Sequence, residues 1–245
     1  MNAILKPIAS SDEVLVAALR GFRLDPERSY TQQVHQHLRD AIVRGTLRPR
    51  TGLSEATIAT TLEVSRTPVR EALAQLAEEQ LVLIYRKVGT LVAPIPVPLL
   101  EEARFARSTL ECANHVQLAT TITPAQLDEF AGIVDAQRHA VAEGQVDEFF
   151  RLDELMHRRL FEFAGRPHVW AMLQPMKRQF DRVRWLLLDN VTDHARRALA
   201  EHEQILAQIA ARDMARLGAT VAGHIDRVGG HLQAVRERAP DHFID

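Results

Sequence analysis

Apolar positions along the chain recur mostly at helical spacing. In the N-terminal third, this spacing predicts three helices, over 30–45, 53–62 and 65–80, and the first of them stops at a glycine. Ser54 and Ser65 are suited to cap the second and third helices, because a serine oxygen accepts a hydrogen bond from a free first-turn N–H group. The expected inward faces are Val34, Leu38, Ala41 and Ile42; Ile58, Ala59 and Leu62; and Val69, Ala72, Leu73 and Leu76.

Two β-rich runs follow the third helix. LVLIY and TLVAP are separated by RKVG, with Gly89 at the turn, which predicts a β-hairpin. Two short helices with a tight turn between them form a helix-turn-helix, and the hairpin after them is its wing. The pattern therefore predicts a winged helix-turn-helix.

The rest of the chain is helical throughout by periodicity. Six antiparallel helices are expected, or seven if Pro175 divides the fourth, and together they make an all-α bundle. Their expected ranges are 99–120, 124–143, 147–163, 166–189, 192–212 and 214–237. The mainly α chain then divides into a variable N-terminal arm (1–29), the winged domain (30–95), the end of a proline-rich linker (96–98) and a helical domain (99–238).

Composition narrows the class of protein. The chain has 245 residues, of which 46% are hydrophobic, and it contains neither a membrane-spanning apolar run nor a signal-peptide pattern. We therefore expect a cytoplasmic protein with no membrane partner. Residues 30–95 carry a net charge of +2 and residues 96–245 carry −4, which indicates two domains with different partners.

The charges at the start of the third helix are unusual. Arg66, Thr67 and Arg70 occupy its first turns, although a helix N-terminus already carries partial positive charge. Two arginines there are unfavourable unless an anion lies in front of them. In a helix-turn-helix the start of the second helix faces the major groove, and DNA phosphates are that anion. The alternative is that these arginines only cover a solvated helix start.

Four residues of the helical domain share the spacing of a metal site. Asp153 and His157 lie four positions apart on one helical face, and His202 and His224 lie on the last two long helices. Each histidine alone is more often a surface or core residue. As a set of one carboxylate and three imidazoles they are suited to a divalent transition metal.

The N-terminal segments resemble the winged helix-turn-helix of the GntR family of bacterial transcription regulators. The resemblance rests on IVRGTLRP, LSEATIATTLEVSRTPVREALAQLAEEQLV and RKVGTLV. It implies DNA contacts from Ser65, Arg66, Thr67 and Arg70, with the wing near Gly89 in the minor groove. This chain departs from the family at Arg50 and Gln80, where glycine is usual, and at Ala56, where many members carry arginine or another polar residue.

The helical domain is similar to the FCD effector-binding domain of the FadR subfamily. That resemblance implies a metal on Asp153, His157, His202 and His224, with Zn²⁺ expected first and Mn²⁺, Ni²⁺ or Fe²⁺ as alternatives. It also implies a small carboxylate effector beside the metal. Arg107 in RSTLE is the expected carboxylate partner, although an ion pair with Glu111 explains it equally well. The remaining histidines of this domain are expected outside the site: His115, His139, His168, His194, His231 and His242.

These patterns predict a ligand-responsive transcription regulator, expected to be a repressor, that binds an inverted-repeat operator as a homodimer. Two alternatives belong to other classes. The metal could hold the bundle together without any effector, or the same ligands could activate water in an enzyme. We expect no enzyme, because the sequence offers no general base paired with the four residues.

Overall fold

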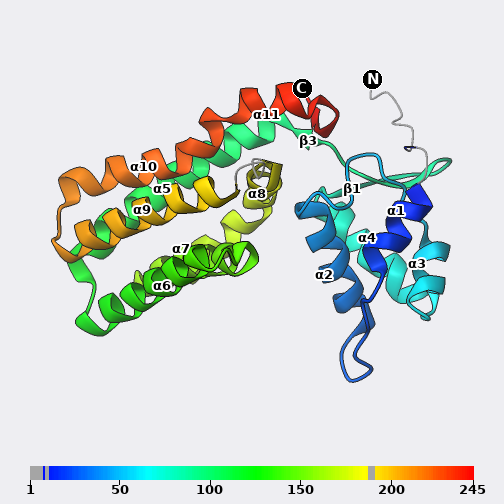
Figure 1. The fold of residues 1–245 in the computed structure, drawn as a ribbon, viewed down its shortest axis with the longest axis horizontal. Coiled ribbons are helices and arrows are strands. Elements are labelled where there is room, and N and C mark those ends of the chain that lie inside the picture. The colour runs from blue at the N-terminus through cyan, green and yellow to red at the C-terminus, as the bar shows by residue number, and fades with distance from the viewer. Residues whose placement is uncertain (1–7, 9–10, 187–190) are drawn as a thin grey trace. The chain divides into compact units, whose positions relative to one another are not determined.

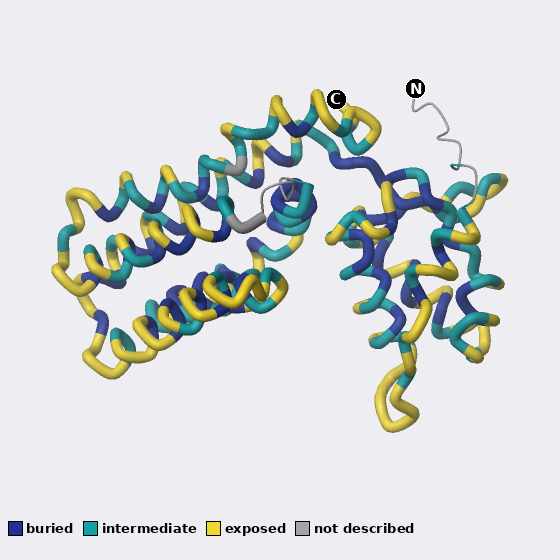
Figure 2. Tube along the Cα trace, viewed as in Figure 1, coloured by how far each residue is buried: buried dark blue, intermediate teal, exposed yellow. Residues whose placement is uncertain are grey.

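The structure, a computed structural model, describes residues 8, 11–186 and 191–245. The chain forms two compact units, Met1–Val97 together with Arg236–Asp245, and Pro98–Val235. Each unit has its own apolar core. Figure 2 shows the buried residues along the inward faces of the helices within each unit. The last part of the predicted helix 166–189, residues 187–189, lies outside the described residues.

The first unit is a winged helix-turn-helix, as the sequence predicts (Figure 1). Strands β1 and β2 pair antiparallel, from Val82 opposite Val92 to Tyr85 opposite Gly89, and form the wing. Its main elements are α1 (Ser11–Leu19), α2 (Tyr30–Val43), α3 (Glu55–Thr61), α4 (Arg66–Glu78), β1 (Val82–Tyr85) and β2 (Gly89–Val92).

The expected inward faces of α2, α3 and α4 are all buried except Leu62, which is half-buried against the same core. Ser54 caps α3, because its hydroxyl accepts a hydrogen bond from the N–H of Thr57 at 3.2 Å. Ser65 occupies the corresponding position before α4 but makes no side-chain cap hydrogen bond. The start of α4 is therefore positioned by packing of its apolar stripe and not by a serine cap.

The N-terminal segment is not a separate arm, which corrects the expectation for residues 11–19. Helix α1 packs against α3, and its Leu15 and Leu19 are buried in the same core as the other helices of this unit. The hydroxyl of Ser11 also accepts a hydrogen bond from the N–H of Gly52 at 3.0 Å. The short apolar pattern EVLVAAL is the physical reason, since burying its stripe stabilises the helix.

The proline-rich linker is shorter than expected, and the C-terminus returns to it. Strand β3 (Ile95–Pro96) pairs in parallel with β4 (Phe243–Ile244), which follows a short 3-10 turn over Pro240–His242. Helix α5 begins at Val97 and contains Pro98 in its first turn, where the missing N–H of proline costs no hydrogen bond. The extended connector thus ends at Pro96, and the last residues of the chain belong to the first unit.

The second unit is a bundle of antiparallel helices. Helix α6 packs against α7 and α9, and α9 also packs against α10 (Figure 1). The helices are α5 (Val97–Thr121), α6 (Pro124–Ala142), α7 (Val146–Phe163), α8 (Pro167–Leu186), α9 (Val191–Ala210), α10 (Met214–Gly230) and α11 (Leu232–Arg238). None of the described helices is long and apolar enough to cross a membrane.

The extra helix of the bundle does not arise at Pro175. Helix α8 continues through that proline, and the break falls instead between α10 and α11, after Gly229 and Gly230. Two successive glycines have low helix propensity, which explains the position of the break. The prediction that Pro175 could divide the fourth helix is therefore wrong.

Left-handed backbone occurs where the family resemblance places glycine. Arg50 has φ 69° and Gln80 has φ 58°, so the backbone of both residues has a conformation that glycine adopts without strain. Glu63, in the turn between α3 and α4, has φ 56°. The turn is closed by a hydrogen bond from the N–H of Val64 to the carbonyl of Ala59 at 3.0 Å, which is the bond of a glycine-type helix end.

Replacing Glu63 by glycine should therefore stabilise the first unit. We expect Glu63→Gly to be more stable than Glu63→Ala by about 1 kcal/mol, because alanine keeps the left-handed strain and glycine removes it. The urea midpoint of the unfolding transition of this unit measures the difference. Equal midpoints for the glycine and alanine variants would show that the turn is not strained.

Candidate functional site

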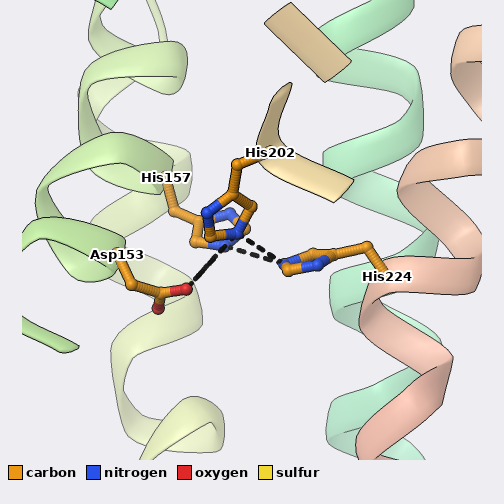
Figure 3. Close-up of side chains that lie close together, drawn as sticks. All are labelled: Asp153, His157, His202 and His224. Carbon is orange, nitrogen blue, oxygen red and sulfur yellow. Dashed lines mark hydrogen bonds and ion pairs between the residues drawn. The ribbon is translucent and has the colours of Figure 1, made fainter. Parts of the chain in front are cut away.

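Four side chains from three helices converge inside the second unit (Figure 3). Asp153 and His157 come from α7, His202 from α9 and His224 from α10. The Nε2 atom of His224 lies 3.3 Å from Nε2 of His157 and 3.4 Å from Nε2 of His202. The Oδ1 atom of Asp153 lies 3.5 Å from Nε2 of His202 and 3.9 Å from Nε2 of His157. The four residues expected from sequence are thus brought together.

The cluster is almost completely removed from solvent. The side chains of Asp153, His157 and His202 are at most 1% exposed, and that of His224 is 9% exposed. Helix α7 buries its Asp153 and His157 on the same face as an apolar stripe that includes Met156. Periodic burial of that stripe therefore points both polar side chains into the bundle.

Each histidine of the cluster has an acceptor beside its outer nitrogen. The acceptors are Glu111 Oε2, 2.6 Å from Nδ1 of His157, Gln137 Oε1, 2.7 Å from Nδ1 of His202, and Glu201 Oε2, 2.8 Å from Nδ1 of His224. An Nδ1–H that donates outward leaves the lone pair on Nε2, directed at the centre of the cluster. Such outer partners are typical of histidines that bind a metal.

Asp153 carries a negative charge into this buried site. Its Oδ2 accepts a hydrogen bond from Nη1 of Arg184 at 2.9 Å, whereas Oδ1 is buried and accepts no hydrogen bond from the described residues. Burial raises the pKa of the carboxyl, but the charge of Arg184 opposes burial, and this pKa lies well below its usual value. The carboxylate is therefore ionised at neutral pH.

Two of the imidazoles facing Asp153, those of His202 and His224, are neutral at the same pH. Burial lowers the pKa of His202 well below its ordinary value and that of His224 to about 3, and neighbouring imidazoles lower both further. Three Nε2 atoms and a carboxylate oxygen face one another at the centre of the cluster. Ligands of a tetrahedral zinc ion lie about 3.3 Å apart, from metal–ligand distances of about 2.0 Å. The donor set therefore fits a divalent transition metal.

The sequence left two roles open for Arg107, as the partner of an effector carboxylate or of Glu111. The structure contains the ion pair with Glu111. Nε of Arg107 donates to Oε1 of Glu111 at 2.7 Å, and both side chains are buried. The other oxygen of Glu111 faces His157, so the arginine is linked to the cluster through that carboxylate. Whether Arg107 also contacts an effector stays a prediction.

A cavity of about 20 Å³ adjoins the cluster. It is bordered by His157 and His224, by the guanidinium groups of Arg107 and Arg184, and by residues that include His194, Ala198, Ile225 and Arg227. A cavity of that volume has room for about one water-sized group. Three of its bordering residues are arginines.

Sequence reasoning missed part of this surrounding shell. His194 was expected outside the site but borders the cavity, and burial lowers its pKa to about 4. His115 is buried close to Glu111, whereas His139 and His168 are exposed, as expected for residues outside a site. The sequence could have shown that Gln137 is buried, because it is a polar residue at helical spacing from the buried Val134 and Ala140.

The residues expected to contact DNA lie on the surface of the first unit. Ser65, Arg66, Thr67 and Arg70 are exposed at the start of α4, and Gly89 is exposed in the wing with φ 97°. They therefore lie where a recognition helix and a wing require them. The exposed Ala56 on α3 offers no polar group at the position where many family members have one.

An anion already faces Arg70 in the absence of DNA. Glu55, on α3, accepts hydrogen bonds from Nη2 of Arg70 at 3.0 Å and from Nε at 3.2 Å. The hydrogen bond and the charge of Glu55 raise the pKa of Arg70. This contact was missed, because the two residues lie 15 positions apart on different helices. It holds the guanidinium at the exposed end of the recognition helix.

Comparison with known proteins places both units in described families. Residues 30–92 match the bacterial regulatory proteins of the gntR family, and residues 102–227 match the FCD domain. The chain is 30% identical over 223 residues to the HTH-type transcriptional repressor RspR of Escherichia coli (strain K12), covering 91% of this chain and 97% of that protein.

Two further similarities extend this result. The chain is 29% identical over 188 residues to the gluconate operon transcriptional repressor of Bacillus subtilis (strain 168), covering 75% of this chain and 76% of that repressor. A GntR transcriptional regulator of Rhodococcus sp. RHA1 has a similar structure, with a TM-score of 0.68, 26% identity, and coverage of 84% of this chain and 99% of that one.

Removal of Arg184 should destabilise the second unit more than removal of a surface arginine. Arg184→Met leaves the buried carboxylate of Asp153 without its guanidinium, and we expect a loss of about 3 kcal/mol in protein freed of divalent ions. Arg151→Met, which removes an exposed ion pair with Glu148, is the control and should cost less than about 1 kcal/mol. Urea unfolding measures both. Equal losses in the two variants would contradict a charged Asp153, and adding Asp153→Asn to Arg184→Met should recover stability.

Proposed function

We propose that this chain is a repressor controlled by a metal-bound organic anion. The proposal starts from the finding that the chain belongs to the GntR family of bacterial regulatory proteins and carries an FCD domain. Family membership makes the chain a DNA-binding transcriptional regulator and not an enzyme. The observation that carries the proposal is the convergence of Asp153, His157, His202 and His224 in a buried site beside a cavity bordered by arginines.

The DNA contacts that we propose come from the start of α4 and from the wing. Ser65, Arg66, Thr67 and Arg70 would contact bases and phosphates in the major groove, and the wing near Gly89 would enter the minor groove. Exposure of all five residues supports this assignment. Arg70 would exchange its hydrogen bonds to Glu55 for hydrogen bonds to a phosphate or a guanine, because either offers two acceptor atoms.

We also propose that the operator is an inverted repeat bound by a homodimer. One recognition helix reads only a few base pairs, so useful specificity requires two half-sites related by the twofold axis of a dimer. A protein of this kind acts on the chromosome, which favours a cytoplasmic location.

The metal that we propose is divalent. One carboxylate and three imidazoles favour Zn²⁺, and Mn²⁺, Ni²⁺ or Fe²⁺ remain alternatives because mixed nitrogen and oxygen ligands do not select sharply among them. The ion would supply a positive charge that binds an anionic oxygen. Glu111, Gln137 and Glu201 would hold the imidazole rings in place for it.

Charge balance supports an anionic effector. Three carboxylates surround the centre, those of Asp153, Glu111 and Glu201, and each is paired with an arginine, respectively Arg184, Arg107 and Arg227. A divalent ion would then add two uncompensated positive charges in a buried place, which is unfavourable unless an anion accompanies it. A small carboxylate on the metal and beside Arg107 would supply one of the two negative charges, and a dicarboxylate would supply both.

The size of the cavity favours a second candidate, in which the metal has only a structural role. A space of about 20 Å³ admits a carboxylate group poorly unless neighbouring side chains move. In that case the ion would join α7, α9 and α10, and no effector would exist. The response of DNA binding to organic acids separates the two candidates.

Two arginines should be essential for operator binding. We expect Arg66→Ala and Arg70→Ala to weaken binding to the inverted repeat by at least tenfold each, because a good base contact contributes about 1 to 3 kcal/mol. Gel shifts with the intact and the half operator measure this loss and the number of protomers bound. Arg238→Ala, an exposed arginine outside α4 and the wing, would control for loss of charge elsewhere. Wild-type affinity in both recognition-helix variants would refute their assignment.

The metal and the effector should depend on the same histidines. We expect His202→Ala and His224→Ala to lower metal content and to abolish the response to small carboxylates, with DNA binding in the absence of effector retained, because the winged unit has its own core. His168→Ala, which removes an exposed histidine, is the matched control. Elemental analysis and operator binding in the presence of organic acids provide the readouts.

The possible results distinguish the candidates. Variants that bind metal as the parent does would contradict the metal site. If the variants lose metal, and DNA binding by the parent protein never responds to an organic acid, the metal has only the structural role.

A further inference from the structure

A second pocket lies in the helical unit, away from the four metal-type ligands. It has a volume of about 270 Å³ and is bordered by α5, α8, α10 and the start of α11. None of its bordering residues belongs to the cluster of Asp153, His157, His202 and His224 or to the smaller cavity beside it. The pocket is therefore a separate feature of the bundle.

The inner wall of the pocket is apolar and closely packed. Leu100, Phe180 and Val183 border it and are at most 3% exposed, so they are fixed by packing on their other sides. The guanidinium of Arg107 lies 5.7 Å from the centre of the Phe180 ring, within the usual range of a cation–π contact. A hydrophobic cavity of about 150 Å³ holds a benzene molecule. The larger volume here accommodates an aromatic ring with a short side chain.

The rim of the pocket has an excess of negative charge. Arg104 donates from Nη1 to Oδ1 of Asp226 at 2.9 Å, and Glu101 is a second carboxylate on the same rim. Gly229 makes this arrangement possible, because a Cβ there would lie only 2.7 Å from Cδ of Arg104. Two carboxylates and one guanidinium favour a ligand that carries a positive charge over one that carries a negative charge.

We infer that this pocket binds a small aryl-alkyl ammonium compound, with its ring against Phe180 and Val183 and its ammonium group at Glu101 and Asp226. The aromatic body matches the volume and the apolar wall, and the cation matches the rim. A carboxylate ligand would have to compete with Asp226 for Arg104 and would face Glu101. None of the residues that border this pocket is a proposed metal ligand, so the protein would have a second input beside the metal centre.

Three probes of similar shape and different charge test the inference on the full-length protein. Isothermal titration calorimetry should show saturable binding of 2-phenylethylamine, about tenfold tighter than that of the neutral 2-phenylethanol, because a charge-assisted contact is lost in the alcohol. The anionic 3-phenylpropanoate should bind most weakly. Absence of saturable binding by the amine, or equal affinity for all three probes, would overturn the inference.

Reversal of the rim charge provides a sharper test. In Glu101→Gln/Asp226→Asn, Arg104 becomes the one charged group among the three polar residues named on the rim, so the order of affinity should invert and 3-phenylpropanoate should bind best. Glu102→Gln removes an exposed carboxylate that does not border the pocket and should leave the order unchanged. An unchanged order in the double variant would refute the assigned rim.

Two more variants distinguish binding in this pocket from binding at the metal-type site. Val183→Trp should fill the pocket and abolish binding of every probe, and the double variant on the rim remains decisive if tryptophan prevents folding. His224→Ala should bind 2-phenylethylamine as the parent does, with or without chelator. Loss of probe binding in His224→Ala would assign the probes to the metal-type site and overturn the inference, whereas failure of the metal proposal leaves this result unaffected.

Discussion

The structure of the helical unit depends on one buried carboxylate. Asp153 is ionised inside the bundle and faces the Nε2 atoms of His157, His202 and His224, and the imidazoles of His202 and His224 are neutral. Such an arrangement is stable only if positive charge lies close by, and Arg184 supplies part of it from α8. The remaining oxygen and the three nitrogens lie at the spacing of ligands around one cation. A metal in this place would connect α7, α9 and α10, which also share the apolar core of the unit.

The charges around this carboxylate form pairs that extend outward. Each of the three acidic residues near the centre has an arginine partner, and the arginines Arg107, Arg184 and Arg227 border the small cavity. A divalent ion would make the net charge at the centre positive and would therefore favour binding of an anion. In this way metal binding and effector binding would be linked. At the surface of the DNA-binding unit, Glu55 accepts hydrogen bonds from Arg70. We propose that a nucleic-acid anion replaces Glu55 in this contact.

Local periodicity accounts for what the sequence could predict. The stripes on α2 and α4 and the β-hairpin follow from spacing alone, and Asp153 and His157 share a face because they are four residues apart on one helix. Contacts between distant segments were not predictable in this way. The pairing of Arg70 with Glu55, the acceptor role of Gln137 and the return of the C-terminal strand to Ile95 all depend on tertiary packing. The helix over 11–19 was underestimated because its partner surface on α3 is not adjacent in sequence.

X-ray absorption at the metal edge of the full-length protein, loaded with one equivalent of Zn²⁺, tests the central claim most directly. The account predicts scattering from three imidazole rings and an oxygen ligand at about 2.0 to 2.1 Å. This signature requires Asp153, His157, His202 and His224 to act together on one ion. A spectrum of hydrated zinc, or one with a sulfur ligand, would contradict the account.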